Sequence, residues 1–113
     1  MRMIQTLKEN PQLSDFQEHI KSVCKEFGWA NNNHLEIFLL FSEEVGELAK
    51  AIRKQTELHS KTVDSNIEEE IADVFNYLLD IANYFGIDLE QAYRNKIDKI
   101  VEREKNVKLL NNK

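Results

Sequence analysis

The sequence predicts an all-α protein, a four-helix bundle-like protomer with antiparallel helices. Apolar residues recur at helical spacing in four segments, and no stretch alternates with a period of two over the length of a strand. Glycine and proline are scarce, with three and one in 113 residues, which disfavours a loop-rich or turn-rich fold. The length argues for a single domain over residues 1–113, with a core at about 14–105 and a frayed tail at 106–113.

The first two helices are predicted from their caps and their apolar spacing. The first covers about residues 14–27, where Ser14 and Gln17 are spaced as a capping box and Gly28 supplies a stop. Three consecutive asparagines follow at 31–33. Any of them could cap a second helix that runs to about residue 55.

The last two helices are predicted in the same way. The third follows Ser65, which opens a second capping-box pattern, and it ends at Gly86. The fourth follows Asp88 and runs to about residue 105. Short links after the first and third helices favour antiparallel neighbours in a compact bundle. The polar connection at 56–63 is the candidate for a mobile loop.

The charge of the chain is acidic, with 20 Asp and Glu against 15 Lys and Arg and a net charge of −5. Proteins that bind the nucleic-acid backbone are normally basic, so this class is disfavoured. The single cysteine excludes an intrachain disulfide and a cysteine-based zinc site. No apolar run of 18 residues predicts a membrane span and no signal-peptide core is present, so a cytoplasmic protein is expected.

Four acids fall where a surface helix would carry apolar side chains. On a helical wheel Glu44 and Glu47 lie in or beside the apolar stripe of the second helix, and Glu70 and Asp73 do so in the third. Each pair is spaced i,i+3 and projects from one side of its helix. If these faces meet, the carboxylates must either raise their pKa values or hold a cation such as Mg²⁺, Mn²⁺ or Ca²⁺. Solvated acids in a glutamate-rich chain are the less favoured alternative.

The same acids form a linear pattern, Glu43-Glu44-Val45-Gly46-Glu47, separated by 22 residues from Glu70-Ile71-Ala72-Asp73. This pattern resembles the EExxE…ExxD signature of the MazG-type all-α nucleoside triphosphate pyrophosphohydrolases. The segment Gly86-Ile87-Asp88-Leu89 is also similar to that family. The resemblance covers about residues 14–105, which is nearly the whole chain.

The resemblance implies hydrolysis of a nucleoside triphosphate, often a deoxynucleotide, between its α and β phosphates. The products would be a nucleoside monophosphate and pyrophosphate. The cofactor it implies is Mg²⁺, which Mn²⁺ could replace, and the implied metal ligands are Glu44, Glu47, Glu70 and Asp73. A carboxylate that is partly free could take a proton from the attacking water, and Glu43 and Glu47 are the candidate catalytic bases.

Cationic and aromatic residues are candidates for contacts with the substrate. The resemblance assigns Lys96 and Arg103 to this role, and Lys54 is a further candidate, because phosphates bind cationic side chains. Trp29 and Tyr77 resemble positions that contact the nucleotide in related enzymes, and an aromatic ring can stack on any base. The alternatives are a solvated face for each cation and ordinary core packing for each aromatic residue.

The third helix also predicts an assembly. Its apolar and aromatic side chains cover about 240° of the helical wheel, more than one face of a single protomer can use. We therefore expect a homodimer or a homotetramer, and the resemblance implies a dimer or a dimer of dimers. A non-catalytic nucleotide- or metal-binding regulator of the same fold is the alternative function, and a purely structural helical protein is a third. The preferred base and sugar stay open at this point.

Overall fold

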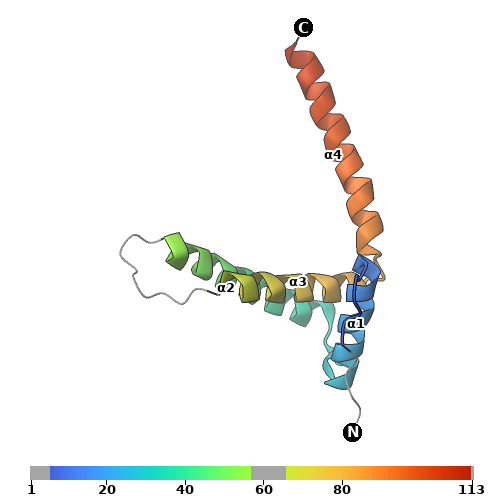
Figure 1. Cartoon of the computed structure of the whole chain (residues 1–113), viewed down its shortest axis with the longest axis vertical. Coiled ribbons are helices and arrows are strands. Elements are labelled where there is room, and N and C mark those ends of the chain that lie inside the picture. Colours follow the sequence, from blue (N-terminus) through green and yellow to red (C-terminus); the bar gives the residue numbers. More distant parts are fainter. Residues whose placement is uncertain (1–5, 57–65, 113) are drawn as a thin grey trace.

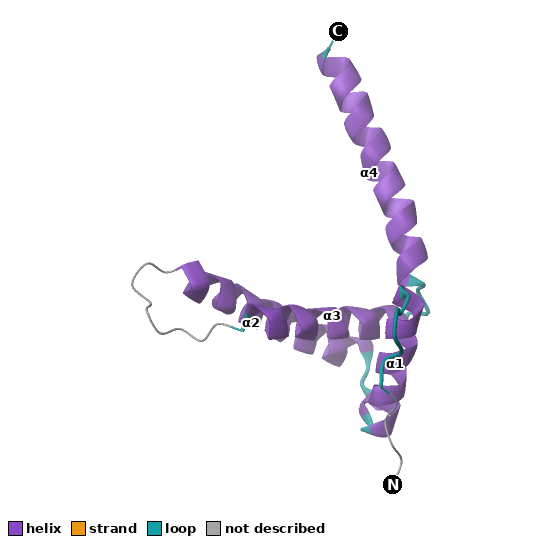
Figure 2. Cartoon of the chain, in the orientation of Figure 1, coloured by secondary structure: helices purple, strands orange, loops and turns teal. Residues whose placement is uncertain are grey.

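The computed structural model describes residues 6–56 and 66–112, and these residues are almost entirely helical (Figures 1 and 2). No strand occurs among them, so the predicted all-α class is confirmed. The elements are α1 (Leu13–Glu26), the short 3-10 helix η1 (Trp29–Asn31), α2 (His34–Thr56), α3 (Ile67–Tyr84) and α4 (Leu89–Asn111). The predicted mobile connection at 56–63 lies outside the described residues except for Thr56, which ends α2.

Helix α1 begins at Leu13, and its cap differs from the prediction. Asp15 accepts a hydrogen bond from the backbone N–H of Gln12 at 2.8 Å, which is the reciprocal bond of a capping box. The predicted pair of Ser14 and Gln17 is therefore wrong. The reason is that tertiary packing uses Gln17 elsewhere, in the interior of the protein.

Gln17 links three elements of the fold. Its amide nitrogen donates to Asn83 Oδ1 at 3.1 Å and to the Ile87 carbonyl at 2.8 Å, while its Oε1 accepts from the Leu89 N–H at 3.0 Å. Asn83 returns a hydrogen bond to the Gln17 carbonyl at 2.8 Å. These bonds fix the middle of α1 against the end of α3 and the first residue of α4.

The other helices begin at side-chain caps. Asn33, Asn66 and Asp88 each accept a hydrogen bond from the backbone N–H three residues further on, at 3.0, 3.2 and 3.1 Å. The structure thus selects one of the three predicted asparagines and confirms the cap of α4. Helix α3 is capped by Asn66 rather than by Ser65, which lies outside the described residues.

Helices α2 and α3 lie side by side and antiparallel, and they form the most extensive contact between any two described elements (Figure 1). Helix α1 packs across α3, where Phe16 and Phe75 meet edge to face with ring centroids 5.6 Å apart. The core is small. Its buried apolar side chains are Cys24, Ile37, Ala51, Leu79 and Ala82, of which Leu79 is the most completely enclosed.

Helix α4 does not join this packing, which corrects the prediction of a compact bundle with the fourth helix beside the third. Figure 1 shows α4 extending away from the α2–α3 pair, with its contacts to α1 near its start. It also continues to Asn111 where a frayed tail was predicted, because residues 106–111 include no glycine or proline that would end a helix. The radius of gyration is 18.5 Å, whereas a compact chain of this length has about 13 Å. No described helix is both long and apolar enough to cross a bilayer.

Candidate active site

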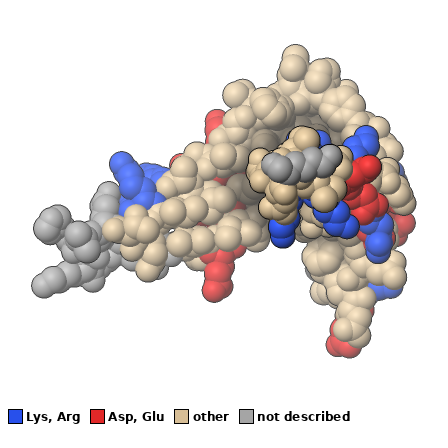
Figure 3. Space-filling view, turned by 90° about the horizontal axis from the view of Figure 1, so that it is seen from above, with Lys and Arg blue, Asp and Glu red and all other residues tan. Residues whose placement is uncertain are grey.

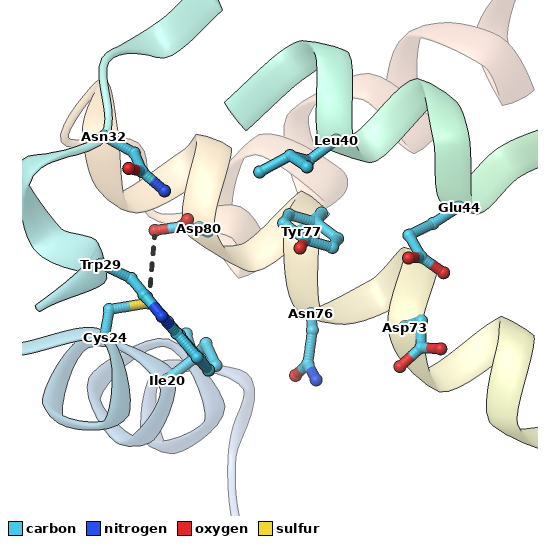
Figure 4. A pocket seen from close by; sticks show the side chains of 10 residues that line it. All are labelled: Ile20, Cys24, Trp29, Asn32, Leu40, Glu44, Asp73, Asn76, Tyr77 and Asp80. Atoms are coloured by element: carbon cyan, nitrogen blue, oxygen red, sulfur yellow. Dashed lines mark hydrogen bonds between the residues drawn. The ribbon is translucent and has the colours of Figure 1, made fainter. Parts of the chain in front are cut away.

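A pocket of about 450 Å³ opens between α1, η1, α2 and α3. Figure 4 shows that its lining differs from one end to the other. Carboxylates from α2 and α3 lie at one side, and we call this region, with the adjoining Glu70, the acid end. The opposite side, which we call the Asp80 end, is lined by Ile20, Cys24, Trp29, Asn32 and Asp80.

Three carboxylates converge at the acid end. Glu44 comes from α2, while Glu70 and Asp73 share one face of α3, and one oxygen of each lies within 4.8 Å of the others. The Oε2 atom of Glu70 is buried and has no hydrogen-bond partner among the described residues. A buried carboxylate oxygen without a partner is unfavourable, and it suggests that a cation belongs beside it. Hard oxygen donors in this arrangement fit a divalent ion such as Mg²⁺ or Mn²⁺.

Burial, together with the neighbouring carboxylates of the acid end, changes the proton affinity of Glu44. Its pKa is raised first by burial and then by the charges of Asp73, Glu70 and Glu47. Glu47 is therefore close enough to act on Glu44, although its side chain is exposed and stands outside the group of three. Glu43 is also exposed and lies outside that group. The structure thus brings together three of the four predicted metal ligands. Neither predicted base belongs to this group, although Glu47 lies near enough for its charge to act on Glu44.

Both predicted aromatic residues line the pocket. Tyr77 lies one helical turn after Asp73, and its pKa is raised by burial and then by the charges of Glu44 and Asp73. Trp29 stacks on Phe27 with ring centroids 5.0 Å apart and an interplanar angle of 25°. Because Trp29 is still 51% exposed, Phe27 supports its indole ring while leaving surface for a ligand.

The predicted phosphate-binding cations lie elsewhere. Lys54 is in the last turn of α2, and Lys96 and Arg103 are exposed on α4, where Arg103 pairs with Glu104 at 3.9 Å. Among the residues that the structure describes, no lysine or arginine lines the pocket. In the space-filling view, blue side chains surround α4 and mark the end of α2 (Figure 3). The acidic site therefore has no cation in its wall from the described part of its own chain.

Asn32, Asn76 and Asp80 also line the pocket, and none was among the predicted site residues. A sequence signal existed for Asp80, which follows Asp73 by seven residues, or nearly two helical turns, and so falls on the same face of α3. Its pKa is raised by burial, while a hydrogen bond from the Cys24 thiol acts in the opposite direction.

Cys24 is a small core residue that also borders the pocket. Its Sγ donates to Asp80 Oδ1 at 3.9 Å, the contact drawn in Figure 4. Burial comes first among the causes that raise the pKa of this thiol to about 11, followed by the charge of Asp80 and their hydrogen bond. The thiol is therefore protonated at neutral pH and serves as a weak donor rather than as a nucleophile.

Comparison with known families agrees with this site. The model of the MazG nucleotide pyrophosphohydrolase domain matches residues 32–108, which is more than half of the chain and includes every residue of the acid end. The chain belongs to the MazG nucleotide pyrophosphohydrolase family. At the family level this MazG protein is a hydrolase of the nucleotide pyrophosphohydrolase class.

Two relatives resemble this MazG chain in sequence, and one of them also resembles it in fold. YpjD and YvdC, two uncharacterised proteins of Bacillus subtilis strain 168, are 29% and 27% identical over 96 and 101 residues. Those alignments cover 82% and 81% of this chain, and 86% and 95% of the relatives. The crystal structure of YpjD, a presumed pyrophosphatase, matches with a TM-score of 0.71 and 28% identity, over 82% of this chain and 96% of that one.

Proposed function

We propose that this MazG protein hydrolyses a nucleoside or deoxynucleoside triphosphate between its α and β phosphates, releasing the monophosphate and pyrophosphate. The observation that carries the proposal is the convergence of Glu44, Glu70 and Asp73 at one end of a pocket of about 450 Å³. The family match supports the reaction class. Trp29 and Tyr77, which line the same pocket, would contact the nucleoside.

The acid end would hold Mg²⁺, or Mn²⁺ in its place. Glu44, Glu70 and Asp73 would be its ligands, and the unpartnered Oε2 of Glu70 supports this assignment. Glu47, whose charge already acts on Glu44, would be a fourth ligand. When bound, the ion neutralises phosphate charge and lowers the pKa of a coordinated water. Without a cation, three carboxylates would repel a triphosphate.

A general base is also required, and an exposed glutamate beside the acid end would supply it. Glu43 and Glu47 are the candidates, and neither belongs to the group of three convergent carboxylates. Glu47 is the better placed, since its charge contributes to the raised pKa of Glu44. A carboxylate that is partly free can accept the proton of the attacking water.

We also infer that the active form is a homodimer or a homotetramer. The accessible surface is 9564 Å², whereas a compact monomer of 13.3 kDa exposes about 6,500 Å². Obligate interfaces bury about 2,000–5,000 Å² counted over both partners, so the extra surface of one chain is large enough to form its half of such an interface. Figure 3 shows few charged side chains over the α2–α3 pair. Large apolar side chains exposed on α2 and α4 include Leu35, Phe38, Leu39, Leu109 and Leu110.

Such an assembly would also explain the missing cations. Lys96 and Arg103 stand on the helix that projects from its own chain, and Lys54 stands at the far end of α2. A neighbouring copy that covers the apolar faces would carry its own cations toward the phosphates. Light scattering should give twice or four times the monomer mass of 13.3 kDa, and a monomer would contradict this part of the proposal.

The reaction is tested by identifying its products. Phosphorus NMR of a nucleotide panel with Mg²⁺ should show pyrophosphate and a monophosphate, the signals should stop appearing when a chelator is added, and excess Mg²⁺ should restore them. Orthophosphate with a nucleoside diphosphate would contradict the proposed bond cleavage. Tight nucleotide binding without turnover over hours would indicate a regulator instead.

A further inference from the structure

The Asp80 end of the pocket has the lining expected around a flat, uncharged ligand group. Trp29 is supported by its stack on Phe27, and Ile20 adds an apolar wall. Two polar side chains, Asn32 and Asp80, point into the same region in Figure 4. A ring that entered here would pack against apolar and aromatic surface and would meet hydrogen-bonding groups at its edge.

The distance between the two ends suits a nucleotide. Asp73 and Asp80 lie on the same face of α3 and are seven residues apart, which is about 10 Å along the helix. The sugar of a nucleotide separates its base from its phosphates. If the phosphates occupy the acid end, the base reaches Asp80.

The chemistry of Asp80 restricts what its ligand can present. An ionised carboxylate only accepts hydrogen bonds. The donor that Asp80 has within the described part of the pocket is the Cys24 thiol at 3.9 Å, a weak one, so the carboxylate keeps most of its accepting capacity. An amino group on a base would donate to it. A keto oxygen in the same place would face the Asp80 carboxylate with no hydrogen between the two acceptors. Repulsion between two acceptors is most unfavourable at a desolvated site.

We propose that Asp80 is a specificity-determining residue that selects bases with an amino group at C4 of a pyrimidine or C6 of a purine, cytosine or adenine, over uracil, thymine or hypoxanthine, which carry a keto oxygen there. The inference rests on the proposed function, because that function is what places a nucleotide in the pocket. Asn32 can form a hydrogen bond with the neighbouring ring nitrogen of the base, since its amide both donates and accepts.

Matched pairs of substrates test this directly. dCTP carries an amino group where dUTP carries a keto oxygen, and dATP differs from dITP in the same way. For the pair that the pocket accepts, kcat/KM should favour the amino member at least about tenfold in the wild type. In Asp80→Asn the ratio should move toward one through a gain for the keto member, because an amide can also donate. Asp98→Asn, the same exchange at an exposed position on α4, should keep the wild-type ratio.

Two results would overturn the inference: a wild type that does not discriminate within either pair, or a folded Asp80→Asn variant with the wild-type ratio. Calorimetry with dCMP against dUMP, and dAMP against dIMP, separates this question from turnover. If no nucleotide is hydrolysed but the amino member binds more tightly and the preference is lost in Asp80→Asn, the proposed reaction fails and the role of Asp80 stands. Equal binding of both members, or no binding of either, would count against that role.

Discussion

The two ends of the pocket share helix α3 but differ in charge density, with three convergent carboxylates at one end and a single carboxylate at the other. At the acid end, Glu70 and Asp73 face Glu44 across the α2–α3 contact, and no cationic side chain of the described residues lines the wall. At the other end, the single carboxylate of Asp80 stands beside Trp29 and a protonated thiol. Crowded like charges need a cation, whereas one desolvated acceptor needs a neutral donor. The comparison therefore assigns cation binding and hydrolysis to the acid end, and discrimination between bases to the Asp80 end.

Removing one carboxylate from the acid end should have the largest effect. In Glu70→Gln we expect kcat/KM to fall by at least about a hundredfold for every nucleotide, because an amide has no charge with which to hold a divalent cation. The ratio between amino and keto substrates should not change, since Asp80 is untouched. Steady-state kinetics on the folded variant measure both quantities.

Glu69→Gln is the matched control, because Glu69 is the adjacent residue of α3 and its side chain is exposed. It should keep wild-type kinetics. An equal loss in the two variants would mean that the net charge of α3, rather than the carboxylate cluster, supports the reaction.

The reactivity of Cys24 probes the opposite end. With a pKa of about 11 in place of its ordinary 9.0, the thiol of the folded protein carries roughly a fiftieth of the thiolate of the unfolded chain at pH 9. Alkylation by iodoacetamide at pH 9 should therefore be at least about fiftyfold slower than in denaturant. A nucleoside monophosphate should slow it further, whereas pyrophosphate with Mg²⁺ should not. If the nucleoside monophosphate and pyrophosphate with Mg²⁺ slow the alkylation of Cys24 equally, the two ends of the pocket do not bind different parts of a nucleotide.

A smaller effect concerns stability at alkaline pH. The pKa of Cys24 is higher in the folded state, so the contribution of its protonated thiol is complete below about pH 9 and is lost as pH rises toward about 11. The melting temperature of the wild type should accordingly fall over this interval by more than that of Cys24→Ala. Parallel curves for the two proteins would show that the thiol is not held in its protonated form.

The sequence identified the acid end because the pattern there is local. Glu70 and Asp73 are spaced to share one helix face, and Glu44 interrupts an apolar stripe, so a helical wheel is enough to find them. The caps at Asn33 and Asp88 were equally local.

What the sequence could not supply depends on contacts between distant segments. Gln17 has the spacing of a cap but is held by groups near residue 85, and this network sets where α4 leaves the body of the protein. The spacing of Asp80 from Asp73 places it on the same face of α3, but the sequence does not show why it matters, because Trp29 and Asn32 come to the same pocket from a different segment. The direction of α4 was also hidden from the sequence, because its apolar side chains, such as Leu109 and Leu110, are typical of a packed helix and yet are exposed among the described residues.

The central claim, that the acid end is a cation site, is tested most directly by thermal melting with and without Mg²⁺, in the absence of nucleotide. A ligand that binds only the native state raises the melting temperature as its concentration increases. The wild type and Glu69→Gln should show this Mg²⁺-dependent rise, and Glu70→Gln should lose it. An unchanged melting temperature in the wild type, or the same rise in Glu70→Gln, would contradict the account.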